Sequence, residues 1–111
     1  MKLHNKRAKK PGMNTWGELK GMDIRINFGV IDKGDSFPEE ALHYHKSRNT
    51  YFCVITGSLQ IEVEGQIIEV TNEAMLQVFP NEKYRVVSVG DDGATYVVVG
   101  DHAEADKVTL D

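Results

Sequence analysis

The feature that most constrains this chain is a succession of short apolar runs, each followed by a turn signal. In the run 24–30, Ile, Ile, Phe and Val alternate with Arg, Asn and Gly, the period-two pattern of a half-buried strand. The run Leu59–Val63 alternates in the same way with glutamine and glutamate. Turn signals recur about every 8 to 12 residues, as expected for a sandwich or barrel of short strands. Further extended segments are expected at 41–45, 51–56, 66–70, 75–79, 84–89 and 95–99.

Turn-forming residues separate these strands. Gly57 and Ser58 are expected to end the apolar strand 51–56, and the segment 90–93 is expected to end the strand that starts at Tyr84. Only 102–107 is expected to form a helical turn. Eight or so short strands without a helix of normal length predict an all-β fold, and a closed jelly-roll barrel leaves the fewest exposed edges.

Length and composition are those of one soluble domain. A chain of 111 residues with 41% hydrophobic content can bury one core but not two. The single cysteine, Cys53, excludes a disulfide framework and a cysteine-rich zinc site. No apolar run approaches the roughly 18 residues of a membrane helix, and no secretory signal is recognisable. We expect no membrane partner and a cytoplasmic location.

Charge is distributed unevenly along the chain. Five of the 13 basic residues lie in the first ten positions, which leaves 8 basic against 17 acidic residues in the remainder. Residues 1–12 are therefore interpreted as a basic arm and 13–111 as the domain. A basic arm can bind nucleic acid, or it can dock on its own acidic domain or stay mobile. The acidic body offers no basic face to extend such a footprint, so no nucleic-acid partner is expected.

The segment His43-Tyr44-His45 is the strongest candidate for chemistry. Two histidines at i and i+2 of an extended segment point to the same face. That spacing suits two imidazoles on one metal ion, two acid–base groups on one substrate, or two surface histidines beside a charged loop.

A family resemblance adds to this pattern. The stretch His43-x-His45-x4-Thr50-x6-Gly57, followed by an alternating strand, resembles the first motif of the cupin superfamily, G-x5-H-x-H-x3,4-E-x6-G. The likeness covers residues 34–89 and implies a small jelly-roll barrel with its site inside. It also implies a complete site of three histidines and one glutamate.

Two positions of that site depart from the motif. Thr50 replaces the acidic ligand, and Arg85 aligns with the histidine of a second motif of which only Pro80 remains. A hydroxyl is a poor transition-metal ligand and a guanidinium repels cations, so His43 and His45 are the only metal ligands of the usual kind. Other donors could complete a divalent metal site. The candidates are Gln77 and His102, with Cys53 as a softer donor that alternation aims away from Thr50.

The substitutions also support a site without metal. If Arg85 points into the barrel beside His43 and His45, its guanidinium can bind a carboxylate or phosphate, and the histidines can move protons on that anion. The alternative is that Arg85 pairs with a carboxylate of the body, such as Glu82 or Glu73. Metal-free cupins that isomerise nucleotide-linked keto sugars are similar in using a histidine pair.

Further residues are expected around the same cavity. Arg48 and Asn49 lie in a loop at its mouth, and Thr50 and Gln77 are candidate ligand contacts. Phe52 and Phe79 are expected to line its wall, Tyr44 and Tyr51 to face away, and Trp16 to cover a barrel end or join a dimer contact. By analogy with other small barrels a homodimer is expected.

Three functions stay open at this point. The first is an isomerase or epimerase acting on an anionic, sugar-like molecule through His43 and His45. The second is a metal-dependent cupin, such as an oxygenase, with an irregular ligand set. The third is a module that binds a small molecule without chemistry.

Overall fold

The all-β prediction is confirmed. The computed structural model describes residues 1, 3–10, 12–19, 24–33, 40–101 and 106–110, and it contains nine strands and no helix within them. The predicted helical turn at 102–107 falls mostly outside these residues, and 107–109 is a strand. The strands are β1 (Arg7–Lys10), β2 (Met13–Leu19), β3 (Ile24–Ile31), β4 (His43–His45), β5 (Thr50–Val63), β6 (Gln66–Thr71), β7 (Met75–Val78), β8 (Tyr84–Gly100) and β9 (Lys107–Thr109).

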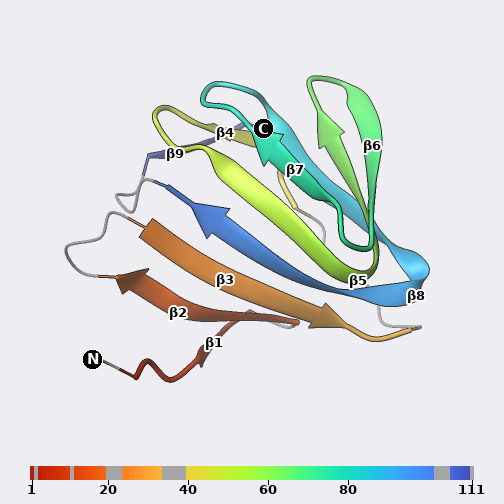
Figure 1. Cartoon of the computed structure of the whole chain (residues 1–111). Helices are drawn as coiled ribbons and strands as arrows, with labels where there is room; N and C mark the ends of the chain where they lie inside the picture. The colour runs from red at the N-terminus through yellow and green to blue at the C-terminus, as the bar shows by residue number, and fades with distance from the viewer. Residues whose placement is uncertain (2, 11, 20–23, 34–39, 102–105, 111) are drawn as a thin grey trace.

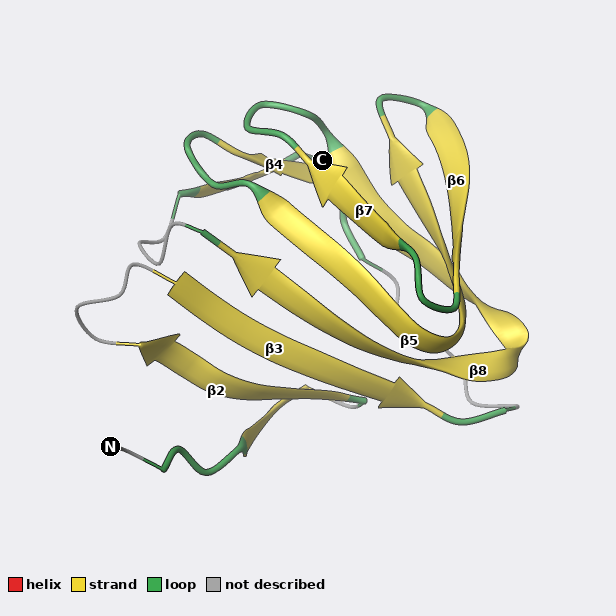
Figure 2. Ribbon diagram, in the orientation of Figure 1, coloured by secondary structure: helices red, strands yellow, loops and turns green. Residues whose placement is uncertain are grey.

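All strand pairs are antiparallel, and the sheet curls on itself (Figures 1 and 2). Its order is β1-β2-β3-β8-β4-β9, while β5 pairs with β6, β7 and β8. The 17-residue β8 and the 14-residue β5 run side by side from register Thr50–Gly100 to register Val63–Tyr84. These two long strands connect the part of the sheet formed by β1, β2 and β3 with the part formed by β6 and β7. The described residues include no long apolar helix that could cross a membrane.

The glycines expected to end strands bend them instead. Both β5 and β8 continue through Gly57 and Gly93, and the β5–β8 register shifts between Val54 and Thr56 and again between Gly57 and Leu59. Gly57 and Gly93 have φ angles of +79° and +80°, a conformation that favours glycine. A Cβ on Gly57 would overlap the carbonyl oxygen of Gly93. The close approach of the two backbones and the bulges therefore allow β5 and β8 each to bend and to continue from one part of the sheet into the other.

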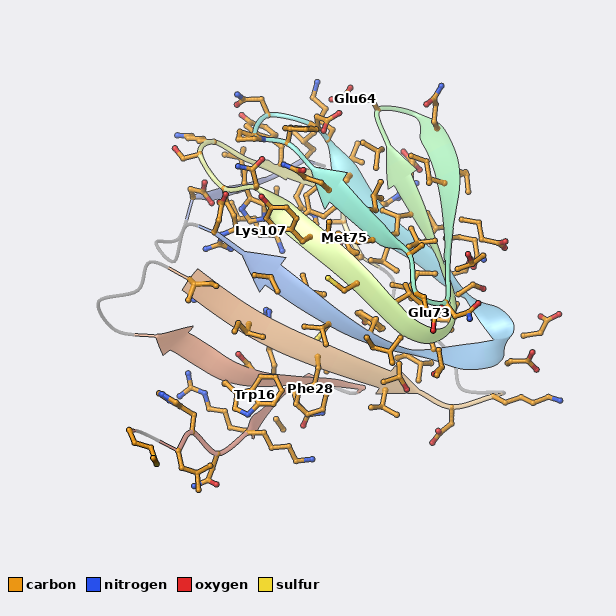
Figure 3. The ribbon with its side chains drawn as sticks, viewed as in Figure 1. Trp16, Phe28, Glu64, Glu73, Met75 and Lys107 are labelled. Carbon is orange, nitrogen blue, oxygen red and sulfur yellow. The ribbon has the colours of Figure 1, made fainter. Side chains whose placement is uncertain are left out.

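β3 buries its more polar side. Asn27, Gly29 and Ile31 are buried, whereas Val30 is 45% exposed. Phe28 lies on the outer side against Trp16, with ring centroids 4.7 Å apart (Figure 3). The inner side is shaped by Tyr96, because a Cβ on Gly29 would lie 2.7 Å from the Tyr96 hydroxyl oxygen. The outer position of Trp16 differs from the predicted cover of a barrel end.

The apolar core is built mainly from β5 and β8. Its most deeply buried side chains are Val54, Leu59, Ile61, Val78 and Tyr96. These side chains fill one part of the half-barrel and leave the part next to β4 for polar groups.

Part of the basic arm is a strand of the sheet. β1 pairs with β2 in the registers Arg7–Thr15, Ala8–Asn14 and Lys10–Met13. The ammonium of Lys6 lies 5.8 Å from the centroid of the Phe28 ring. Residues 7–10 therefore dock at the sheet edge, which brings Lys9 to the rim of the cavity described below.

Candidate functional site

A cavity of about 270 Å³ opens inside the half-barrel, between β4 and the inner sides of β3, β5 and β8. Its apolar wall includes Phe52, Val86, Tyr96 and Val98. Its polar lining holds both histidines of the sequence motif. The charged and polar side chains that line it are Lys9, Arg25, Asn27, Glu40, His43, His45, Arg48, Thr50, Tyr84, Asp106 and Lys107.

The short strand β4 positions the two histidines. His43 and His45 are 4% and 6% exposed, and their ring centroids lie 5.7 Å apart at a nearly perpendicular angle. β4 is fixed from both sides, because His43 pairs with Tyr84 of β8 and His45 pairs with Lys107 of β9. The expectation that i and i+2 share a face matches this geometry.

His45 belongs to a chain of hydrogen bonds. Its Nδ1 lies 2.7 Å from Oδ1 of Asp106, and its Nε2 lies 3.1 Å from the Tyr84 hydroxyl, which in turn lies 3.3 Å from Oγ1 of Thr50. Because Nδ1–H donates to the carboxylate, Nε2 of a neutral His45 accepts a hydrogen bond from the Tyr84 hydroxyl. A protonated His45 donates to Tyr84, and Tyr84 then donates to Thr50. The chain can therefore carry a proton in either direction.

Asp106 lies at the end of this series of hydrogen bonds and holds it in place. Its Oδ2 accepts hydrogen bonds from the backbone N–H groups of Ser47 and Arg48, at 2.7 Å and 2.9 Å. Burial alone would raise the pKa of Asp106, but the bonds from Ser47, His45 and Arg48 outweigh it and lower the pKa to about 2. Asp106 is thus a fixed anion that selects the Nδ1–H form of His45.

His43 has a different environment. Its Nδ1 lies 2.8 Å from the carbonyl oxygen of Ala41, so Nδ1 carries the proton and Nε2 holds a lone pair. Burial lowers the pKa of His43, although the Ala41 bond and the Glu40 carboxylate, 3.7 Å from Nδ1, act in the opposite direction. Nε2 hydrogen-bonds to none of the described residues. The side chain is therefore a neutral base at the cavity.

Tyr84 stands beside both histidines. Its ring centroid is 4.3 Å from that of His43 and 6.0 Å from that of His45. Burial raises the pKa of Tyr84 to about 12, so the hydroxyl stays protonated at neutral pH. Burial also lowers the pKa of His45, opposed by its bond to Asp106. A neutral base and a protonated hydroxyl thus face the same space.

Among the described residues, the cavity lining carries more cations than carboxylates although the chain has a net charge of −4. Its four cations are Lys9, Arg25, Arg48 and Lys107, and its two carboxylates are Glu40 and Asp106. Arg48, predicted at the mouth, is 8% exposed.

Two predicted ligand contacts lie elsewhere. Arg85 is not among the cavity-lining residues and binds Glu62 through Nε and Nη2, at 3.2 Å and 3.0 Å. On β8 the inward positions belong to Tyr84 and Val86, so Arg85 points outward, opposite to the expectation from motif alignment. Gln77 also lies outside the lining and donates to Asn49.

The aromatic expectations are partly met. Phe52 lines the cavity, while Tyr44 and Tyr51 do not, as predicted. Phe79 is 55% exposed and does not line the wall as predicted. Cys53 is partly buried and lies outside the cavity lining.

Sequence reasoning missed Tyr84, Asp106, Arg25 and Asn27. The strand 84–89 contained a signal for Tyr84. Its alternation allows either Arg85 or the pair Tyr84 and Val86 to point inward, and the second choice is the one that the structure shows. Asp106 had no such signal, since its partner His45 lies 61 residues away.

The described residues do not fit a resident divalent metal. They contain no group of three His, Cys, Asp or Glu side chains placed to hold an ion. Both Nδ1 atoms and Nε2 of His45 already face partners, which leaves one imidazole nitrogen, and the neighbouring arginines repel a cation. His102, a candidate donor, lies outside the described residues.

The fold is that of the small cupin and double-stranded β-helix proteins of known structure. No family model and no curated protein sequence matches the chain. Solved structures do. A cupin from Bacteroides fragilis has a TM-score of 0.64 at 18% identity, over 95% of this chain and 89% of that one.

Two further neighbours are named proteins. KdgF from Halomonas sp. matches with a TM-score of 0.64 at 16% identity, covering 93% of this chain and 89% of its own. A variant of Streptomyces Pac13, solved with uridine, matches with a TM-score of 0.73 at 10% identity, covering 97% and 85%. Pac13 is described as a nucleoside dehydratase. At these identities the likeness establishes the fold.

Proposed function

We propose that this cupin binds an anionic, sugar-like small molecule in its cavity and transfers a proton on it, as an isomerase or epimerase does. The observation that carries the proposal is the protonation state and tautomer of His43. Ala41 holds the proton on Nδ1, burial keeps the ring neutral, and Nε2 is left as a base at the cavity. Such a group can remove a proton from a carbon next to a carbonyl.

The neighbouring groups supply the rest of the reaction. When the C–H bond breaks, its electron pair moves toward the carbonyl oxygen, and the cavity's cations stabilise the developing charge. Tyr84 then delivers its proton to the oxygen or the adjacent carbon. The tyrosinate regains a proton from solvent by way of His45, whose transient imidazolium is stabilised by Asp106, while His43 releases the proton that it removed, so the protons balance. Return of a proton to a new position or face completes an isomerisation or epimerisation.

The excess of cations supports an anionic ligand. Four cations stand against two carboxylates in the described part of the lining, within an acidic protein, so a carboxylate or phosphate gains favourable interactions there. Pac13, a neighbour of the same fold solved with uridine, supports the sugar-like part of the proposal, because uridine carries a ribose.

The test is exchange of carbon-bound hydrogen with solvent deuterium, followed by proton NMR. Hydroxylated carboxylates and sugar phosphates are incubated in D₂O with the native protein, with His43→Gln and with the control His4→Gln in the N-terminal arm. We expect exchange in at least one compound, unchanged by His4→Gln and reduced at least about 100-fold by His43→Gln. Binding without exchange would indicate a non-catalytic binding module, and full exchange in His43→Gln would assign the base elsewhere.

A further inference from the structure

The strand register places two arginines around Gly100. Gly100 of β8 pairs with Arg25 of β3 on one side and with Thr50 of β5 on the other. A Cβ on Gly100 would lie 2.7 Å from Cδ and 3.0 Å from Nε of Arg48. The side chain of Arg48 therefore lies across Gly100, between the two neighbouring strands. Because strands are about 4.8 Å apart, Arg25 and Arg48 reach the same small region of the cavity.

Two guanidinium groups around one backbone position form an anion site. Carboxylates and phosphates accept two parallel N–H bonds from a guanidinium, which a lysine ammonium cannot offer. With Lys9 and Lys107, these two arginines give the described lining four cations beside the carboxylates of Glu40 and Asp106.

The next inward residue on β3 is an amide. Asn27 is 7% exposed, lines the cavity, and its buried Oδ1 accepts no hydrogen bond from the described residues. Rotation of the amide exchanges Oδ1 with Nδ2, so either atom can face the cavity. A hydroxyl group both donates and accepts, and it can satisfy the amide in either orientation. A buried amide without a partner is costly, which makes Asn27 a binding group.

We infer that the anionic group of the ligand lies over Gly100 against Arg25 and Arg48, and that a hydroxyl group of the same molecule binds Asn27. The ligand class is a small hydroxylated anion, either a carboxylate or a phosphate ester. Positions i and i+2 of a strand lie about 6.7 Å apart, which matches an anion and a hydroxyl separated by two or three carbons. The inference rests on the proposed function, because it places that function's anionic ligand.

Calorimetric titration tests the ligand class. The native protein is titrated with D-gluconate, D-ribose 5-phosphate, hexanoate and pentyl phosphate, which have the carboxylate or phosphate without hydroxyls, and D-glucose, which has the hydroxyls without charge. We expect gluconate or ribose 5-phosphate to bind at least about tenfold more tightly than its counterpart without hydroxyls and than glucose. The tighter of the two identifies the anion as carboxylate or phosphate.

Four variants test the placement. Arg48→Met is expected to weaken binding of the hydroxylated anion about tenfold or more, while Arg85→Met, which removes an arginine outside the cavity, leaves it unchanged. Gly100→Ala is expected to weaken binding by displacing Arg48, and circular dichroism shows whether it folds. If Gly100→Ala does not fold, the comparison of ligand affinity between Arg48→Met and Arg85→Met decides whether the anion binds Arg48. Asn27→Leu is expected to abolish the preference for the hydroxylated anion over its counterpart without hydroxyls, which is hexanoate for gluconate and pentyl phosphate for ribose 5-phosphate.

The outcomes separate the inference from the proposed function. If no anion binds the native protein, the proposed function fails. If an anion binds equally well to Arg48→Met and Arg85→Met, the anion does not lie over Gly100. If the tighter of gluconate and ribose 5-phosphate binds no better in the native protein than its counterpart without hydroxyls, hexanoate or pentyl phosphate, Asn27 does not bind a hydroxyl group. The same follows if Asn27→Leu keeps the preference.

Discussion

Replacing Asp106 by asparagine removes the charge that fixes the loop after β4 and the protonation state of His45. The pKa of Asp106 falls from 3.8 to about 2. Each pH unit of such a fall corresponds to about 1.4 kcal/mol. The side chain is only 10% exposed, so solvent screens this contribution little. We therefore expect Asp106→Asn to lower the free energy of unfolding by about 2 kcal/mol at pH 7.

The pH dependence provides a sharper test. Because the folded protein depresses this pKa, the stabilisation is complete above about pH 5 and is lost as the pH falls towards 2; about half remains at pH 3. Urea unfolding followed by Trp16 fluorescence measures the difference at pH 7 and at pH 3. Asp92→Asn, in the exposed bend of β8, is the control and should change stability by less than about 0.5 kcal/mol. A loss that is equal at both pH values would refute the electrostatic explanation.

The same variant alters the tautomer of His45. If the asparagine oxygen keeps the backbone N–H groups of Ser47 and Arg48, its amide donates to Nδ1 of His45. The imidazole proton then moves to Nε2, facing Tyr84. Nitrogen NMR of the imidazole should show this exchange, and an unchanged tautomer would remove Asp106 from its positioning role.

Three other expectations follow. Gly57→Ala should cost at least about 2 kcal/mol in urea unfolding, because its Cβ overlaps the Gly93 carbonyl, whereas Gly65→Ala, at a similar φ but with open space, should cost less. In an NMR titration His43 and His45 should both titrate below pH 6.5, so their neutral forms add stability that declines below that pH; a midpoint above 6.5 in either would contradict their burial. Light scattering should give the homodimer expected for small barrels, at twice 12.5 kDa, and a mass of 12.5 kDa would disprove it.

Strand positions were predictable because period-two alternation is a local property. The segments 24–30, 66–70 and 75–79 agree closely with β3, β6 and β7. The two interruptions predicted inside β5 and β8 were wrong, because a glycine at positive φ can bend a strand without ending its pairing. The sequence shows the glycine but not the strand that lies across from it.

The inward face of each strand was harder to predict. The usual rule places apolar side chains inside, yet a barrel with a polar cavity reverses it beside that cavity, as Arg25 and Asn27 of β3 show. At residues 84–86 the usual rule holds, because Tyr84 and Val86 point inward; the motif alignment placed Arg85 there instead. The histidine spacing was informative because two positions of one strand fix their own relationship. Asp106, far along the chain from His45, is brought to it only by the complete fold.

The shared strands β5 and β8 also bear on how the chain reaches this structure. Their first pair, Thr50 and Gly100, joins positions nearly half the chain apart, whereas the β5–β6 hairpin closes between Val63 and Gln66. Local pairing costs little loop entropy, so the hairpin can form early, but neither half of the barrel is complete until β8 lies along β5. Folding should therefore be slow, on the order of milliseconds to seconds, and the histidines, held by β8 and β9, should be among the last groups to reach their places.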